Sequence, residues 1–213
     1  MSKVAIATVS TPNRRSIYEP TNRTKERFCD LNGMDFLFSD SFKEEIGWEG
    51  HDYWLKVLFI QKHLKDYDAI LYMDDDAGFV KMLPDIKEEL YDLPTEPVLY
   101  AWDEQGPNSG VIIVQNTLEG RYFSDWWAEA AKRKEYQHGL FDQEAFVEFV
   151  GDHPDFCHGL DGQVWNAHHP SFNRLLRCPN LYDEERTAIV HVAGGPDRKE
   201  ELLKSGEYGR IFG

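Results

Sequence analysis

Short apolar runs alternate with helix-periodic segments along the first half of the chain. Three runs predict strands, at residues 3–9, 35–39 and 69–73. The third run is apolar throughout, which is typical of a strand covered on both faces, as in parallel sheets. Helices are predicted over residues 22–30 and over residues 53–64, where apolar side chains recur at helical spacing. This alternation predicts an α/β fold, in which ligands collect at the carboxyl ends of the strands.

The second half of the chain continues the pattern less regularly. Residues 106–110 predict a turn, and residues 151–180 predict a loop because they are rich in histidine, proline and asparagine. The other predicted elements, in chain order, are helix 85–90, strands 98–102 and 111–115, helices 118–134 and 142–149, strand 188–192 and helix 199–205. No repeat or linker divides the chain, so we expect one domain over residues 1–213.

Charge and cysteine content narrow the classes of function. A formal net charge of −15 argues against nucleic acid as a partner, because such binding depends on Lys and Arg neutralising phosphates. An anionic ligand must then be met locally, for example through a divalent cation. Three widely spaced cysteines form no CxxC pair, which indicates a reducing, cytoplasmic compartment. No apolar run approaches the roughly 20 residues of a membrane span, so we expect a cytosolic protein or a domain excised from a longer chain.

The most informative motif is the aspartate run Asp74-Asp75-Asp76, directly after the apolar run 69–73. In an extended segment Asp74 and Asp76 point to the same side and can converge on one hard cation. Mn²⁺ or Mg²⁺ would accept these carboxylates and leave positions for phosphate oxygens. Two alternatives stay open at this point. The run can be a solvated acidic turn, or the motif of a haloacid-dehalogenase-type phosphatase, although that family expects Thr or Val where Gly78 stands.

Six segments stand out as ordered landmarks along the chain: YWLK, DAILYMDDDAGFV, NSGVIIVQN, SDWW, DQEAF and HVAGG. Together they resemble the landmarks of glycosyltransferases with the GT-A fold, most closely the galactosyltransferases of the yeast mannan and plant xyloglucan type. The whole chain also resembles an amino-terminal glycosyltransferase domain of chlorella-virus type, which implies a role in capsid glycosylation in the host cytoplasm. The resemblance implies a mixed, mostly parallel central sheet flanked by helices. Residues 1–102 would bind the nucleotide and metal, and residues 103–213 the sugar and acceptor.

The resemblance also assigns metal ligands and catalytic residues. The implied metal ligands are Asp74, Asp76 and His191, and the implied catalytic residues are Asp142 and Asn108. A carboxylate and an amide beside the sugar can orient its hydroxyls and stabilise the transition state. His191 can instead be a core histidine, and Asp142 can also serve as the N-cap of the following helix. The Asp142-Gln143 segment favours, by family likeness, retention of configuration at the transferred sugar.

A further set of residues is expected to contact the donor. In this fold the loop after the first strand holds the base and ribose, and other strand ends approach the diphosphate and sugar. The candidates are Thr8, Ser10, Thr11, Arg15, Asp40, Lys56, Asp75, Ser109, Gly110, Gly194 and Lys199. The loop 8–15 lacks glycine, which argues against a sugar nucleotidyltransferase, since those enzymes cradle a triphosphate in a glycine-rich loop there.

Two aromatic groups receive simpler interpretations. Trp126 and Trp127 are expected to belong to the helix core and not to a sugar platform, because tandem aromatics on a helix face different directions and at least one of the two should be buried. Four histidines have spacings that match no zinc pattern and are expected to belong to an acceptor loop. They are His153, His158, His168 and His169.

The sequence therefore predicts a metal-dependent glycosyltransferase that moves a hexose or deoxyhexose from a UDP-sugar to a hydroxyl of a glycan or glycoprotein acceptor. Its cofactor would be Mn²⁺ or Mg²⁺. A haloacid-dehalogenase-like phosphatase and a nucleotide- or carbohydrate-binding module without turnover are the alternatives.

Overall fold

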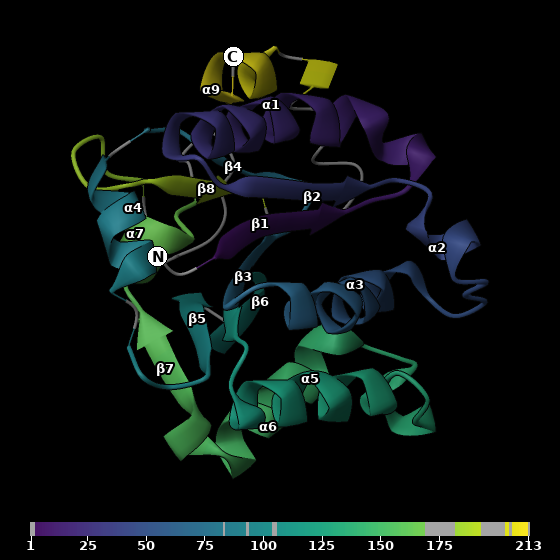
Figure 1. The fold of residues 1–213 in the computed structure, drawn as a ribbon. Helices are drawn as coiled ribbons and strands as arrows, with labels where there is room; N and C mark the ends of the chain where they lie inside the picture. The colour runs from purple at the N-terminus through teal and green to yellow at the C-terminus, as the bar shows by residue number, and fades with distance from the viewer. Residues whose placement is uncertain are drawn as a thin grey trace.

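The computed structural model describes residues 3–82, 84–92, 94–103, 106–168, 182–192, 203–204 and 206–212 (Figure 1). Its main sheet has the strand order β2-β1-β3-β6-β5-β7. The strands are β1 (Val4–Val9), β2 (Asp35–Ser39), β3 (Ala69–Met73), β5 (Val98–Asp103), β6 (Gly106–Gln115) and β7 (Cys157–Leu160). β6 is antiparallel to both neighbours, whereas the other pairings are parallel. The predicted mixed, mostly parallel sheet is therefore confirmed.

Helices cover both faces of this sheet (Figure 1). One core cluster joins Ala5 and Ala7 of β1 to α3 (Leu55–His63), α5 (Leu118–Ala130) and α6 (Asp142–Asp152). The other cluster joins Val4 and Ile6 to α1 (Arg15–Asn32), α4 (Pro84–Tyr91) and α7 (Gly162–Trp165). This alternation along β1 follows from the two-residue period of a strand. β3 is buried at every position, as expected for a strand covered on both sides.

A second sheet brings a late part of the chain beside the end of β3. It pairs β4 (Ala77–Phe79) antiparallel with β8 (Ile189–His191), in a register that sets Ala77 opposite His191. Nearby, α9 (Glu207–Phe212) packs on α1, where the hydroxyl of Tyr208 donates to the carbonyl of Ile17 (3.1 Å). The remaining short helices are α2 (Phe42–Glu45), η1 (Pro12–Arg14), η2 (Asp52–Trp54), η3 (Leu64–Asp66), η4 (Lys134–Tyr136) and η5 (Pro154–Phe156).

Most predicted elements are confirmed, but the structure corrects three of them. Residues 106–110 form the first half of β6 and not a turn, because they pair with β5 after a register shift at Tyr100/Ala101. Residues 151–165, predicted as loop, hold the end of α6, η5, β7 and α7. The predicted helix 118–134 ends at Ala130, before η4. β4 was not predicted, because three residues give too short a pattern to recognise.

Within the described residues, no helix combines the length and the apolar character needed to cross a bilayer. Cys29 and Cys157 are free thiols. Cys178 lies outside the described residues, as do residues 169–180 of the predicted loop 151–180 and most of the predicted helix 199–205.

Candidate functional site

The aspartate run leaves β3 in a loop whose backbone is fixed by neighbouring elements. The amide of Asp74 donates to the carbonyl of Gly110 in β6 (2.7 Å). From α1, Thr21 Oγ1 donates to the carbonyl of Asp75 (2.7 Å), and Lys25 Nζ donates to the carbonyl of Asp74 (3.0 Å). The three carboxylates therefore project from a backbone that is held on both sides.

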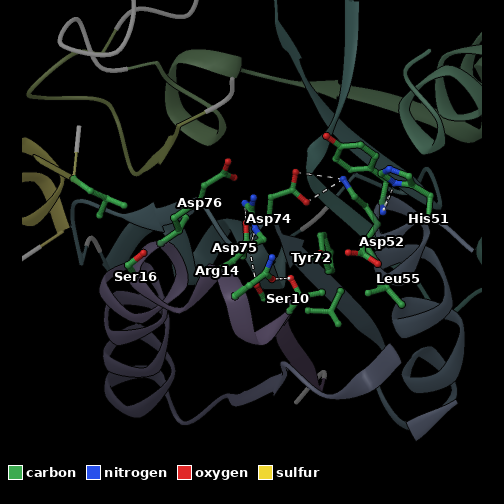
Figure 2. A pocket seen from close by; sticks show the side chains of 17 residues that line it. Ser10, Arg14, Ser16, His51, Asp52, Leu55, Tyr72, Asp74, Asp75 and Asp76 are labelled. Carbon is green, nitrogen blue, oxygen red and sulfur yellow. Dashed lines mark hydrogen bonds and ion pairs between the residues drawn. The ribbon is translucent and has the colours of Figure 1, made fainter. Parts of the chain in front are cut away.

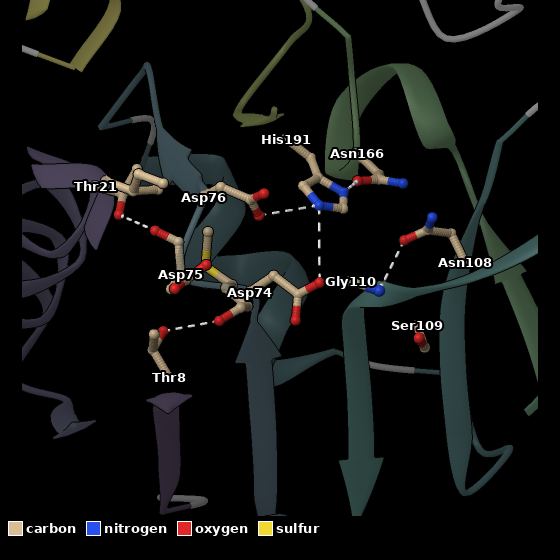
Figure 3. Close-up of polar contacts among 12 residues, drawn as sticks. Thr8, Thr21, Asp74, Asp75, Asp76, Asn108, Ser109, Gly110, Asn166 and His191 are labelled. Carbon is tan, nitrogen blue, oxygen red and sulfur yellow. Dashed lines mark hydrogen bonds and ion pairs between the residues drawn. The ribbon is translucent and has the colours of Figure 1, made fainter. Parts of the chain in front are cut away.

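Asp74, Asp76 and His191 converge at this strand end (Figure 3). Each offers one ligand atom, and these atoms all lie within 4.8 Å of one another. Nε2 of His191 lies 3.2 Å from Asp76 Oδ1 and 3.8 Å from Asp74 Oδ2. The β4–β8 pairing creates this proximity, because it sets His191 opposite Ala77, next to the aspartate run. The sequence-predicted ligand set is thus brought together.

The chemistry of this group suits a divalent cation. Two carboxylates and an imidazole are ligands that Mn²⁺ accepts. Nδ1 of His191 faces Oδ1 of the buried Asn166 at 2.9 Å, and since that oxygen can only accept, Nδ1 donates. In the neutral imidazole that carries its proton on Nδ1, Nε2 is the nitrogen left to bind a cation, and it faces both carboxylates. A polar partner on the second ring nitrogen is the usual arrangement for a metal-binding histidine.

Asp75 has a different environment from its two neighbours. Its Oδ2 accepts from Ser10 Oγ and from Arg14 Nε, both at 2.5 Å, and its Oδ1 accepts from Arg14 Nη2 at 2.5 Å. The bonds to Asp75 raise the pKa of Arg14 above its usual value, against the effect of burial. The Asp75 carboxylate therefore orients the loop after β1, whereas the carboxylates of Asp74 and Asp76 lie near His191.

Lys25 lies fully buried beneath the aspartate run. Its Nζ donates to Thr8 Oγ1 (2.9 Å) as well as to the carbonyl of Asp74, and Thr8 Oγ1 donates in turn to the carbonyl of Met73 (2.8 Å). Desolvation lowers the pKa of Lys25 to about 7, although the nearby aspartates act in the opposite direction. Thr8 and Lys25 therefore hold the backbone carbonyls at the end of β3 in place.

A second charged cluster adjoins the first through Asp74. Lys56 Nζ lies 2.9 Å from Asp74 Oδ1 and 3.2 Å from Asp142 Oδ2, and Ser109 Oγ donates to the same Asp142 oxygen (2.9 Å). Burial by itself would lower the pKa of Lys56, but Asp142 and Asp74 outweigh it and hold that pKa above its usual value. Desolvation raises the pKa of Asp142, and the Lys56 charge opposes that rise.

Asp142 is the first residue of α6 and not its N-cap, since Phe141 occupies the cap position. Its carboxylate turns toward Lys56, and its carbonyl accepts from Trp127 Nε1 (3.0 Å). The expected core role of Trp127 is confirmed, because its side chain is fully buried. The next residue, Gln143, accepts from the amide of Ser109 through Oε1 (2.8 Å). Helix α6 is thereby fastened to β6 at the site.

Asn108 and Gly110 lie on β6 between the two clusters. Asn108 Oδ1 accepts from the amide of Gly110 (2.7 Å), and its Nδ2 donates to Asp103 Oδ2 (2.5 Å). A Cβ on residue 110 would lie 2.2 Å from Cε1 of His191. Glycine is therefore required for the imidazole to reach the aspartates.

A cavity of about 520 Å³ opens over the aspartate run and Lys56 (Figure 2). Asp74, Asp75 and Asp76 line its centre, with Lys56 beside them. Three groups of residues complete the lining: Val9, Ser10, Thr11, Asn13, Arg14, Ser16 and Ile17 after β1; His51, Asp52, Tyr53 and Leu55 around η2; and Tyr72 and Leu203. The volume is in the range that holds a small-molecule ligand.

Several residues predicted as donor contacts lie elsewhere. The Arg15 side chain is 73% exposed and pairs with Glu19 (3.2 Å), so the cavity is lined by its neighbour Arg14 instead. Asp40 accepts from Tyr18 Oη (2.5 Å) and does not line the cavity. Gly194 and Lys199 lie outside the described residues.

The histidines expected in an acceptor loop are dispersed. His153 packs on Phe149 of α6 with ring centroids 4.5 Å apart, and His158 lies 3.7 Å from Glu96. His168 is nearer the site, with its ring centroid 6.1 Å from that of His191. His169 lies outside the described residues.

Three residues of the site were not foreseen from the sequence. Arg14 and Asn166 carry no local signal, because only the fold brings them to Asp75 and His191. Lys25 has a signal that could have been read: it precedes the buried Phe28 and Cys29 by three and four residues, so it shares their inward face of α1.

Comparison with solved structures identifies the fold. A glycosyltransferase involved in the glycosylation of the major capsid of PBCV-1 superposes with a TM-score of 0.71 at 16% identity, covering 95% of this chain and 98% of its own. GlyE of Streptococcus pneumoniae TIGR4 has a TM-score of 0.61 at 14% identity, covering 99% of this chain and 64% of its own. The galactosyltransferase LgtC, in complex with donor and acceptor sugar analogs, has a TM-score of 0.58 at 12% identity, covering 98% and 95%.

The chain thus has the GT-A, Rossmann-like fold of these glycosyltransferases. It spans somewhat less than two thirds of the GlyE chain. No family model matches the sequence, and no curated protein matches it. At these identities the likeness shows the fold, and the activity must be argued from the site.

Proposed function

We propose that the protein is a metal-dependent glycosyltransferase that transfers a hexose or deoxyhexose from a UDP-sugar to a hydroxyl of a glycan or glycoprotein acceptor. The observation that carries this proposal is the sharing of Asp74 between two clusters beside one cavity, which Asp74, Asp76 and Lys56 line. On one side it belongs to the cation-binding group with Asp76 and His191, and on the other it contacts Lys56, which pairs with Asp142.

The cation-binding group would bind the diphosphate leaving group of the donor. Mn²⁺ or Mg²⁺ held by Asp74, Asp76 and His191 would neutralise charge on the departing diphosphate. The net charge of −15 makes such a cation the natural means of accepting an anion. Ser10, Thr11 and Arg14 line the cavity at the end of β1 and would contact the nucleoside. Asp75, which already accepts from Ser10 and Arg14, would lie close to the ribose.

The second cluster, which contains Lys56, Ser109 and Asp142, would act on the transferred sugar. Asp142, a proposed catalytic residue, would stabilise positive charge that develops on the ring as the diphosphate leaves. Lys56 and Ser109 hold its carboxylate in one direction, which is the condition for such preorganised stabilisation. Asn108 would orient a sugar hydroxyl. The Asp142-Gln143 segment supports retention of configuration.

The phosphatase alternative is disfavoured by the position of Gly78. A haloacid-dehalogenase-type phosphatase carries Thr or Val there. A Cβ on Gly78 would lie 2.9 Å from the Phe212 ring and 2.9 Å from Thr24 Oγ1, so the packing of β4 against α1 and α9 leaves little room for such a side chain. Phosphate release from a simple phosphomonoester would contradict the glycosyltransferase proposal.

The acceptor and location complete the proposal. The fold shared with the PBCV-1 capsid enzyme over most of both chains supports a role in viral capsid glycosylation in the host cytoplasm. In this proposal, residues 1–102 bind the nucleotide and supply two of the three metal ligands, while residues 103–213 supply the third, His191, and the sugar-side residues Asn108 and Asp142.

Calorimetric titration of UDP with and without Mn²⁺ tests the metal role directly. We expect UDP to bind tightly only with Mn²⁺, and Asp76→Ala to remove that difference. Asp155→Asn, which changes an exposed aspartate outside the cavity, is the matched control. Equal UDP binding in both conditions would overturn the metal role. Slow hydrolysis of a UDP-sugar without acceptor would separate an enzyme from a binding module.

A further inference from the structure

His51 and Tyr53 line one side of the cavity, and the half-buried Phe141, which is not part of the lining, packs against both rings to form what we call the aromatic rim. His51 and Tyr53 come from η2 and its cap, and Phe141 precedes α6. The His51 ring centroid lies 4.7 Å from that of Tyr53 and 4.1 Å from that of Phe141, with interplanar angles of 20° in both pairs. Tyr53 and Phe141 are 5.3 Å apart. His51 and Tyr53 are exposed, Tyr53 by 55%, so this aromatic rim presents ring surface to solvent.

Local contacts hold the aromatic rim in place. His51 Nδ1 accepts from the amide of Tyr53 (3.4 Å), which caps η2. The carbonyl of His51 accepts from Trp48 Nε1 (3.1 Å), and Lys43 Nζ contacts Asp52 Oδ1 (2.6 Å). The rings are therefore oriented before any ligand arrives, which reduces the entropy lost on binding.

The backbone of Phe141 is strained, and it sends the side chains of Phe141 and Asp142 to different places. Its φ of 50° makes it the one non-glycine residue with positive φ among those described, and its ψ is −115°. This conformation directs the Phe141 ring to His51 while the next side chain, Asp142, turns into the buried contact with Lys56. Strain of this kind persists where the surrounding structure enforces it, and it is found mostly at functional sites.

The aromatic rim and the nucleoside candidates lie at different parts of the cavity. Figure 2 shows His51 and Asp52 on one side of Asp74, and Ser16 and Asp76 on the other. The residues after β1 that would hold the nucleoside include Ser10 and Arg14, which contact Asp75. The aromatic rim instead adjoins Asp142, where the sugar would be transferred. A ligand on the aromatic rim would thus lie on the side of Asp74 away from Asp76.

We propose that the aromatic rim formed by His51, Tyr53 and Phe141 binds a pyranose ring of the glycan acceptor. This inference rests on the proposed glycosyltransferase function. Aromatic faces bind the apolar C–H face of a sugar ring, and rigid tyrosines supply contact area at low entropic cost. The exposed carboxylate of Asp52, which also lines the cavity, can accept hydrogen bonds from the sugar hydroxyls.

Three substitutions test the aromatic rim. Tyr53→Ala removes one ring, Tyr53→Phe retains it, and Phe141→Gly removes the second ring while accepting the positive φ. Tyr122→Ala, at a half-exposed tyrosine on α5 outside the cavity lining, is the control. Thermal melts show that each variant folds.

Binding is measured in two arms on the whole chain. Calorimetry with UDP and Mn²⁺ reports the nucleotide site. Saturation-transfer NMR with a panel of methyl pyranosides and disaccharides, in the presence of UDP and Mg²⁺, reports the acceptor site. We expect Tyr53→Ala and Phe141→Gly to weaken pyranoside binding about tenfold, the effect of losing a stacked ring, with UDP affinity unchanged. Tyr53→Phe and Tyr122→Ala should behave as the unaltered protein.

The two arms separate failure of this inference from failure of the proposed function. A loss of UDP affinity in Tyr53→Ala would show that the rings hold the base, which overturns the inference. Pyranoside binding that is absent from the unaltered protein, or unchanged in both ring-deletion variants, overturns it too. If UDP binds equally with and without metal, the metal role in the proposed function fails instead.

Discussion

Nε2 of His191 lies 3.2 Å from Oδ1 of Asp76, and the amide of Val192 donates to the carbonyl of the same aspartate (3.0 Å). Side chain and backbone thus join β8 to the aspartate run at the same point. The relative position of the two proposed ligands is therefore set by strand pairing before a cation binds.

Substitution of Asn166 should weaken metal binding without touching a ligand. In Asn166→Ala the imidazole of His191 loses the oxygen that orients its Nδ1. Changes in such supporting residues typically cost about 10–100-fold in metal affinity. Titration of Mn²⁺ into the UDP-bound protein measures the loss, with exposed Gln61→Ala as control. An unchanged Mn²⁺ affinity would mean that the amide does not orient the ring.

Gly110→Ala should displace His191. The added Cβ would lie 2.2 Å from Cε1 of the imidazole, and overpacking of this kind costs about 1–3 kcal/mol in unfolding free energy. We expect lower stability in urea denaturation together with loss of Mn²⁺-dependent UDP binding. Gly151→Ala is the matched control, since a Cβ there meets nothing within 4 Å and the residue lies in α6, where alanine is favoured. Retained Mn²⁺ dependence in Gly110→Ala would contradict the proposed geometry.

Lys56→Met should destabilise the fold as well as the site. It leaves the buried Asp142 without its cationic partner, and breaking a buried pair costs about 3–5 kcal/mol. Lys62→Met removes an exposed pair with Glu45 and should change the unfolding free energy by about 1 kcal/mol or less. Denaturation of both variants at neutral pH makes the comparison. Equal losses would show that Lys56 is not needed to neutralise Asp142.

Asp142→Asn should separate turnover from nucleotide binding. The amide oxygen can still accept from Ser109, so the packing should survive, but the negative charge beside the sugar is lost. We expect turnover of a UDP-sugar to fall by about 100-fold or more while UDP affinity with Mn²⁺ is retained. Steady-state kinetics and calorimetry measure the two effects. A variant with normal turnover would remove Asp142 from the catalytic role.

Cys29 should react slowly with alkylating reagents. Burial raises the pKa of its thiol to about 12, so the reactive thiolate is scarcer at pH 8 than at an ordinary cysteine. We expect alkylation by iodoacetamide at pH 8, followed by peptide mass mapping, to be at least about 100-fold slower in the native protein than in urea. Because the folded pKa is the higher one, the protonated thiol stabilises the fold below pH 9, and this contribution is lost as the pH rises toward 12. Rapid native labelling of Cys29 would contradict its burial.

Local sequence patterns were enough to locate most strands of the main sheet. β2 and β3 have the predicted bounds, because runs such as DFLFS and AILYM carry their own strand signal and end in polar residues. The aspartate run was likewise recognisable, since three carboxylates after a buried strand are unusual. β7 escaped prediction because its four residues are strand only through pairing with β5.

The sequence by itself determined the α/β class and the position of Asp74 to Asp76 at a buried strand end, since both depend on the order of side chains within a few residues. Tertiary structure decided which groups meet those carboxylates. The choice of Arg14 over Arg15, the placement of Asn166 behind His191 and the burial of Lys25 depend on strand register and helix rotation. Those are fixed by packing between distant segments, which no local pattern records.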